Sequence, residues 1–329
     1  MTLDRSSALA ALGLANRAPS VHNSQPWRWR IGPTSIHLFA DLDRALPATD
    51  PDGRDLRISC GAALHHLRVA LLATGLASTV HRIPDPSRST HLAGVEVGHG
   101  EPTPDDLALA AAIERRRSDR RVFSTWPVPP GHLTELAEVA AGEGAVLHVV
   151  ESARELRTVG LLVEHAAVQQ ALRPGTAVEV AQWTGRSRGA EAGVPAVNVP
   201  AAPAGTIPAR HVADARQDQS RLGDGETDRT VVALLATSTD SPVDQLRAGE
   251  ALSAVLLAAT RLGLATDPIS QPLELADTRL ELRRVCLDDR AEPQVLVRLG
   301  WAPVSASAVP ATGRRPVGAT IDAFEAAWN

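Results

Sequence analysis

The sequence contains no lysine and no tyrosine, so all 33 of its basic residues are arginine. Without lysine the chain cannot form a Schiff base or use the lysine of a P-loop or a protein kinase. Without tyrosine no phenol can serve as a general acid or a nucleophile. The two cysteines, Cys60 and Cys286, are too few for a thiolate zinc site and too far apart for a CxxC redox pair.

Size and charge narrow the possibilities further. The 329 residues are 44% hydrophobic, enough to give one large or two ordinary domains a core. The formal net charge of -5 disfavours nucleic acid as a partner. The hydrophobic run 251–265 is shorter than the ~20 residues that span a bilayer. The run 7–15 follows Asp4, which favours an amphipathic helix over a signal peptide. We expect a cytoplasmic protein without a membrane partner.

Two hydrophobic segments, 61–78 and 249–266, align without gaps. Both are apolar nearly all round, as in a helix buried on every side, and both end in Gly-Leu-Ala, where glycine can end a helix with a positive φ. Such a repeat favours two related halves over convergence of two Ala/Leu-rich helices. The identical residues are Gly61, Ala63, Leu64, Ala70, Gly75, Leu76 and Ala77 in the first segment and Gly249, Ala251, Leu252, Ala258, Gly263, Leu264 and Ala265 in the second.

Hydrophobic periodicity predicts an α+β fold in which helices cover largely antiparallel sheets. We assign residues 1–100 to a first half and residues 101–329 to a second. Residues 182–208 are rich in Gly, Pro and Ala without periodicity, which is typical of either a lid or a disordered insertion. Helices are expected near 6–18, 52–76, 104–117, 131–141, 152–172 and 242–263, and strands near 27–31, 36–40, 79–83, 92–97, 146–150, 231–236 and 294–299.

Four short strings carry candidate chemistry. Residues 18–27 read Ala-Pro-Ser-Val-His-Asn-Ser-Gln-Pro-Trp, a loop stiffened by two prolines that presents hydrogen-bonding groups. Residues 115–121 read Arg-Arg-Arg-Ser-Asp-Arg-Arg; these arginines repel one another unless an anion binds, although a solvated basic face is the ordinary alternative. The Thr-Asp-Pro-Ile-Ser-Gln turn at 266–271 and the Gly-Arg-Arg-Pro string at 313–316 are weaker signals.

Together these strings resemble the FMN-dependent nitroreductase family, and in particular its internally duplicated, Acg-type branch. The resemblance covers about residues 8–316, with the loop at 18–27 as its specific part. It implies a flavin that lies between two halves, because in the family one subunit supplies the arginine box and the other the Pro-Ser-x-x-Asn loop. The residues that match the family's FMN-binding motifs are Pro19, Ser20, Asn23, Gln25, Arg116, Ser118, Arg120, Pro268, Ile269, Ser270, Gln271, Arg314 and Arg315.

The chain departs from a simple family member in one respect. The first half has the Pro-Ser loop without an arginine box, and the second half has the box without the loop. The resemblance therefore predicts one FMN per chain, at a site that both halves build, in an intrachain pseudo-dimer that can be monomeric.

Two other motifs do not support a function. The Gly-x-Ser-x-Gly string at 185–189 lacks a preceding strand and a well-spaced acid and histidine, so a hydrolase is disfavoured. No stretch completes the Gly-x-Gly-x-x-Gly of a dinucleotide fold. His65 and His66 fit a buried helix better than a metal site, and no metal is expected.

The resemblance implies an oxidoreductase that passes a hydride from NAD(P)H through flavin N5 to a small, unidentified acceptor. No catalytic side chain is needed, because the flavin carries the chemistry. We expect Arg120 near flavin N1 and O2, and Arg116 with Arg314 or Arg315 at the phosphate. The alternative is a flavin-sequestering protein in which the segment 182–208 covers the ring and blocks turnover.

Overall fold

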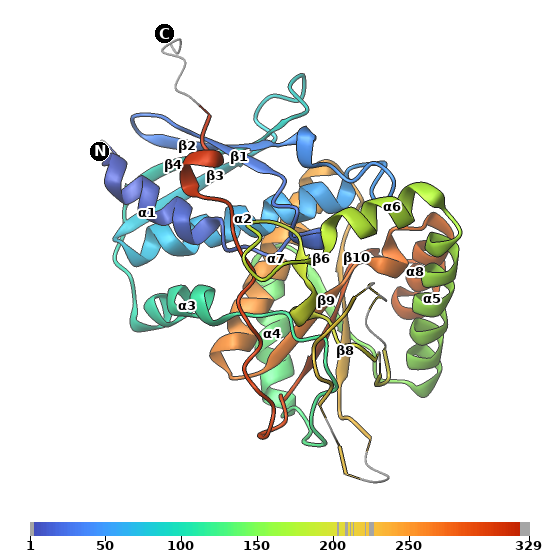
Figure 1. Cartoon of the computed structure of the whole chain (residues 1–329). Helices are drawn as coiled ribbons and strands as arrows, with labels where there is room; N and C mark the ends of the chain where they lie inside the picture. The colour runs from blue at the N-terminus through green and yellow to red at the C-terminus, as the bar shows by residue number, and fades with distance from the viewer. Residues whose placement is uncertain are drawn as a thin grey trace.

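The computed structural model describes residues 3–202, 204–207, 210, 212, 214–220, 222–223 and 227–322. Two four-stranded sheets and two central helices form its framework (Figure 1). One hydrophobic core lies between the first sheet and the helices α1 (Arg5–Ala15) and α2 (Arg54–Ala73). A second core lies between the second sheet and α7 (Pro242–Arg261). The α+β prediction is confirmed.

The first sheet consists of four strands that the alternating pattern had predicted within a few residues. They are β1 (Trp27–Ile31), β2 (Ser35–Ala40), β3 (Leu76–Arg82) and β4 (His91–His99). Every pair is antiparallel, and the order is β1-β2-β4-β3. Trp27 and Trp29 alternate with exposed arginines along β1 and are completely buried, as period-two alternation requires.

The second sheet has the order β5-β8-β10-β9, again antiparallel throughout. In both sheets the first, second, fourth and third strands in chain order are neighbours. Helix α3 packs against α2 and α7, helix α4 packs against α7 and β5, and α5, α6 and α8 lie on the right in Figure 1. The bounds are α3 Pro104–Arg115, α4 Pro130–Gly142, β5 Val146–Val149, α5 Ala153–Ala171, α6 Pro174–Trp183, β6 Thr184–Arg186, β7 Val194–Pro195, β8 Val231–Thr237, β9 Ala265–Ile269, α8 Ala276–Leu287 and β10 Glu292–Gly300.

The helices α2 and α7 cross at the glycines that begin the two repeat segments. A Cβ atom on Gly61 would lie 2.0 Å from the carbonyl oxygen of Leu246, and one on Gly249 would lie 1.9 Å from that of Ile58. Only glycine allows this approach of two backbones. Gly75 and Gly263 have φ values of 82° and 84°, which confirms that glycine ends each helix.

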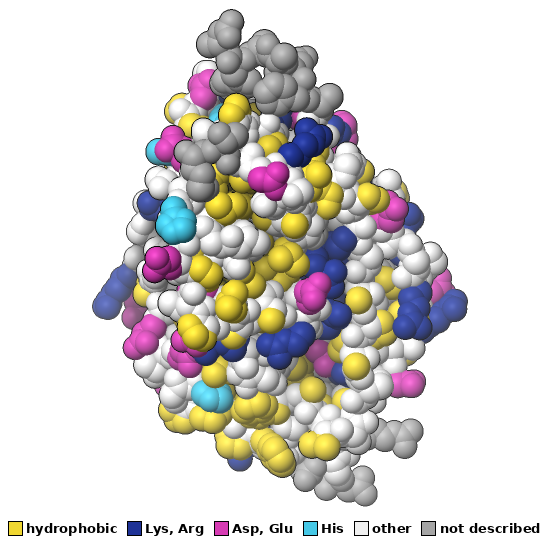
Figure 2. All heavy atoms as spheres, turned by 90° about the vertical axis from the view of Figure 1, so that its left-hand side faces the viewer, with side chains coloured by type: hydrophobic (Ala, Val, Ile, Leu, Met, Phe, Trp, Pro, Cys, Tyr) yellow, Lys and Arg dark blue, Asp and Glu magenta, His cyan; other side chains and the backbone are white. Residues whose placement is uncertain are grey.

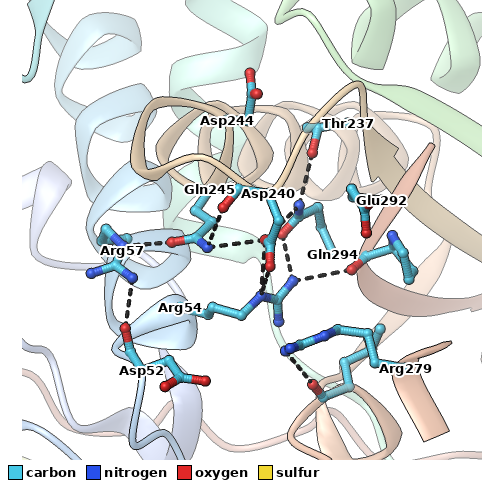
Figure 3. Close-up of polar contacts among 12 residues, drawn as sticks. Asp52, Arg54, Arg57, Thr237, Asp240, Asp244, Gln245, Arg279, Glu292 and Gln294 are labelled. Atoms are coloured by element: carbon cyan, nitrogen blue, oxygen red, sulfur yellow. Dashed lines mark hydrogen bonds and ion pairs between the residues drawn. The ribbon is translucent and has the colours of Figure 1, made fainter. Parts of the chain in front are cut away.

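A polar cluster ties the start of α2 to the second sheet (Figure 3). The buried Arg54 donates from Nε to Asp240 (3.0 Å) and from Nη2 to the Gln294 side chain (2.7 Å) and the Pro293 carbonyl (3.0 Å). Gln294 in turn donates to Thr237 Oγ1 (2.8 Å). This cluster therefore fixes the first turn of α2 relative to the strands of the second half.

The pattern analysis missed three larger elements: α6, β9 and α8. The segment 182–208 is also more structured than an irregular stretch, because it contains β6, β7 and the 3-10 helix η3 (Ala196–Asn198); residues 203 and 208 lie outside the described residues. Among the described residues, no helix is long and apolar enough to cross a membrane.

Candidate functional site

The predicted motifs meet around one cavity of about 180 Å³. The wall from the first half is the end of α1, the loop after it and one face of α2. The walls from the second half are the loop after α3, residues within 184–199 together with 210 and 212, β9 with the turn after it, and the C-terminal segment 309–314. Its lining includes Pro19, Ser20, His22, Asn23, Asp55, Ser59, Arg116, Ser118, Arg120, Asn198, Arg210, Pro268, Ile269, Ser270, Gln271 and Arg314.

The loop that carries Asn23 is strained and tightly held. His22, Asn23 and Gln25 have φ values of 52°, 53° and 53°, a left-handed conformation that costs a non-glycine residue about 1 kcal/mol or more. The Asn23 Nδ2 donates to the carbonyls of Gly193 (3.0 Å) and Gly313 (3.1 Å). The buried Asn23 Oδ1 has no hydrogen-bond partner in the described part of the chain, so a ligand can use it.

Gln25 and Arg315 do not line this cavity. The Gln25 amide donates to the Glu191 carbonyl (2.8 Å) and accepts from the Arg315 backbone N–H (2.9 Å). The Arg315 guanidinium turns toward Asp41 (3.1 Å). Both residues thus connect the loop to its surroundings, and their predicted cofactor contacts would have to be indirect.

One end of the cavity is strongly basic. Arg116 is only 5% exposed, and its Nε and Nη1 atoms have no hydrogen-bond partner among the described residues. Burial, with Arg117, Arg17 and Arg120 nearby, lowers the pKa of Arg116 to about 10. Burial, with Arg116, Arg17 and Arg117 nearby, lowers the pKa of Arg314 to about 9, and its Nε also lacks a partner among the described residues. Such clustered, desolvated cations favour an anion.

Arginine side chains gather near the middle of one face of the molecule, beside hydrophobic side chains (Figure 2). Arg17 was not predicted, although it also lines the cavity. The acid inside the arginine box does not neutralise this end, because Asp119 pairs with Arg121 (2.7 Å). The box is held in place where the Asp119 N–H donates to the Thr266 carbonyl at β9 (2.8 Å).

Arg120 lies between the basic end and β9. Its Nη1 donates to the Asn198 carbonyl (3.3 Å), and its Nε lies 4.0 Å from Asp267 Oδ1. The end of β9 and the turn after it then bring Pro268, Ile269, Ser270 and Gln271 to the wall. The Gln271 side chain itself donates to Gln170 on α5 (2.9 Å), so its amide is already engaged.

The other end of the cavity holds polar groups that the sequence did not reveal. Arg210 donates to His22 Nε2 (3.3 Å) and to Glu274 (2.5 Å). Because arginine can only donate, His22 Nε2 must accept, and burial together with Arg210 and Arg120 holds the pKa of His22 well below its usual value. Asp55 is a further polar residue in the cavity lining that the sequence analysis did not single out. Its position as a charged residue at the start of a buried helix is a signal that could have identified it.

The two histidines of α2 lie away from this cavity lining. Both His65 (2.8 Å) and His66 (2.7 Å) hydrogen-bond through Nδ1 to Ser253 on α7. Burial lowers the pKa of His65 to about 4. In the described part of the chain, no cluster of His, Cys, Asp and Glu side chains could hold a metal ion.

No family model matches this chain. The protein named "Putative NAD(P)H nitroreductase Rv3131" of Mycobacterium tuberculosis H37Rv is 43% identical over 322 residues, which cover 97% of this chain and 92% of that protein. The protein named "Putative NAD(P)H nitroreductase acg" of the same strain is 35% identical, covering 94% and 93%. A solved nitroreductase of Desulfitobacterium hafniense with bound FMN is 13% identical, covering 66% of this chain and 98% of that one, with a TM-score of 0.39.

Proposed function

The chain belongs to the nitroreductase family of oxidoreductases, and on that premise we propose that it binds FMN in the cavity described above. The bound FMN would supply hydride transfer between NAD(P)H and a small acceptor whose identity stays open. When bound, FMN supplies the redox chemistry through N5. The protein's own residues bind, orient and shield it.

The observation that carries the proposal is the set of buried polar atoms without partners. Arg116 Nε and Nη1 and Arg314 Nε are enclosed N–H donors at the basic end, where a phosphate dianion would satisfy them and offset their mutual repulsion. Asn23 Oδ1 is a buried acceptor suited to an N–H group of the isoalloxazine ring. Arg120 would stabilise negative charge at N1 and O2 of the ring. The residues present therefore fit the group.

We further propose that the site is composite, with one FMN per chain. The Asn23 loop and the Ser59 face of α2 come from the first half, whereas the arginine box and β9 come from the second. The shared strand order and the reciprocal glycine contact of α2 and α7 support an internal duplication about a pseudo-twofold axis. The chain would then act as its own partner and need no second copy to complete the site. A cytoplasmic location stays a prediction.

One observation favours flavin sequestration as a second candidate. Part of the segment 182–208 packs against the Asn23 loop, where the Gly193 N–H donates to the Asn23 carbonyl (3.2 Å), and Thr184, Val194 and Asn198 line the cavity. A ring covered by this segment could not stack on nicotinamide. In that case the protein would hold FMN without turning over.

Anaerobic titration of the FMN-loaded protein with NADPH, and separately with NADH, tests both candidates. Rapid bleaching of the flavin absorbance supports the enzyme. A bound flavin that neither nucleotide bleaches supports sequestration and contradicts turnover. A protein that cannot take up FMN contradicts both.

A further inference from the structure

Asp55 is a buried carboxyl group in the lining of the cavity. It lies in the first turn of α2, on the same helix face as Ile58 and Ser59, and all three line the cavity. The residue is 4% exposed. No side chain or backbone group among the described residues forms a hydrogen bond or an ion pair with its carboxyl group. Because a buried carboxyl group is normally paired, this one is suited to act on a ligand.

Repulsion of a carboxylate at this position by two acidic residues exceeds its attraction to Arg54 and Arg210. Asp50, in the loop before α2, and Glu274, after β9, both repel it. The cations within reach are engaged elsewhere. Arg54 binds Asp240 and Gln294, Arg210 binds Glu274 and His22, and Arg279 donates to the Leu273 carbonyl (3.3 Å). Burial, followed by Asp50 and Glu274, raises the pKa of Asp55 well above its usual value.

The neighbouring groups are poorer proton donors. His22 Nε2 accepts from Arg210, and its depressed pKa leaves it neutral at pH 7. Glu274 accepts hydrogen bonds from Ser270 (2.7 Å), Gln170 (2.5 Å) and Arg210, so its carboxyl oxygens are already engaged. Asp267 also lines the cavity, and burial raises its pKa, but Arg120 and Arg298 beside it oppose that rise. Asp55 combines access to the cavity with a raised pKa and with a carboxyl group that has no hydrogen bond or ion pair within the described part of the chain.

We propose that Asp55 is the general acid that protonates the electron acceptor, an inference that rests on the proposed function. Reduction of a quinone or nitro group by two electrons adds one hydride and one proton. The hydride originates from NAD(P)H through the flavin, and the proton leaves the Asp55 O–H bond to form an O–H bond on the acceptor. The resulting carboxylate regains a proton from solvent. The acceptor class is thus a neutral molecule with an oxygen that accepts a hydrogen bond.

Two acceptors separate this role from a structural one. A quinone needs a proton during its two-electron reduction, whereas ferricyanide accepts electrons without one. In the FMN-loaded protein, Asp55→Asn should slow reduction of p-benzoquinone by about 10²-fold while ferricyanide reduction and the FMN dissociation constant stay unchanged. Loss of both activities to the same extent, or of neither, would overturn the proposal.

A second measurement needs neither turnover nor flavin. Infrared spectra of the protein at pH 7 should contain the carbonyl band of a buried protonated carboxyl group that is absent from Asp55→Asn; identical spectra would contradict the proposal. Asp50→Asn removes a charge that repels the Asp55 carboxylate, so it should lower the pKa of Asp55. The alkaline limb of the pH profile for the rate of quinone reduction should then move to lower pH, and an unchanged limb would contradict the proposal. If the wild-type protein reduces both acceptors but the Asp55→Asn and Asp50→Asn variants behave like the wild type, the role of Asp55 is wrong and the proposed function stands. A wild-type protein that takes up no FMN overturns the proposed function as well.

Discussion

Replacing Arg116 with alanine should weaken FMN binding while leaving the ligand-free protein at least as stable. In the ligand-free protein this guanidinium is buried beside Arg17, Arg117 and Arg120, with two N–H groups unpaired. Its removal relieves repulsion and desolvation. With phosphate bound, the same two groups would make charge-assisted hydrogen bonds worth about 1.5–3 kcal/mol each.

Because a truncation also creates space for water, we take about 3 kcal/mol as the net loss, which corresponds to an increase of about 100-fold in the FMN dissociation constant. Quenching of FMN fluorescence measures that constant, and thermal unfolding without FMN measures stability. Arg115→Ala is the matched control, because it removes the same charge from the adjacent, exposed residue that does not line the cavity. Equal FMN affinities for wild type and Arg116→Ala, or equal weakening in both variants, would refute the phosphate assignment.

Three further predictions concern the framework and its response to pH. Gly249→Ala should destabilise the protein by about 3 kcal/mol or prevent folding, because the new Cβ would meet the Ile58 carbonyl. Gly142→Ala is the control and should not destabilise it, because a Cβ there has no neighbour within 4 Å. Equal urea unfolding midpoints for the two variants would contradict the close crossing of α2 and α7. Arg54→Met should cost about 2 kcal/mol by removing the ion pair with Asp240 and leaving Gln294 Oε1 without its donor, and an unchanged unfolding free energy would show that this cluster does not hold α2. The pKa of Asp55 is higher in the folded state than in the unfolded one, so the unfolding free energy of the wild type should fall as pH rises from the unfolded pKa toward the folded pKa. Asp55→Asn should lack this part of the pH dependence. Parallel pH profiles of unfolding free energy for the two proteins would contradict the raised pKa.

The elements predictable from the sequence are those with a strong local pattern. Alternating residues marked β1 and β2, and apolar runs marked α2 and α7. The strand β9 was not predicted because Asp267 and Pro268 are unfavourable in most strands. They are tolerated because β9 lies at the edge of its sheet, where β10 is its neighbouring strand. The polar helix α8 escaped because only Thr278, Leu282 and Cys286 are buried on its inner face.

The candidate site shows the same division. Asn23, Arg116 and Arg120 lie in strings whose order of residue types is itself informative. His22 and Arg210 become neighbours only through folding, so local spacing carries no trace of their contact. Arg314 and Arg315 look equivalent in sequence, yet successive side chains of an extended segment point in opposite directions, and only Arg314 lines the cavity.

The number of flavins bound per polypeptide tests the composite site most directly. Native mass spectrometry of the FMN-saturated protein measures this number together with the number of chains in each complex. We expect a single flavin on each chain, retained by monomers, and its loss from both Arg116→Ala and Asn23→Ala, which alter opposite walls. Two flavins on one chain, or flavin found only on complexes of two chains, would contradict a site built by both halves of one chain.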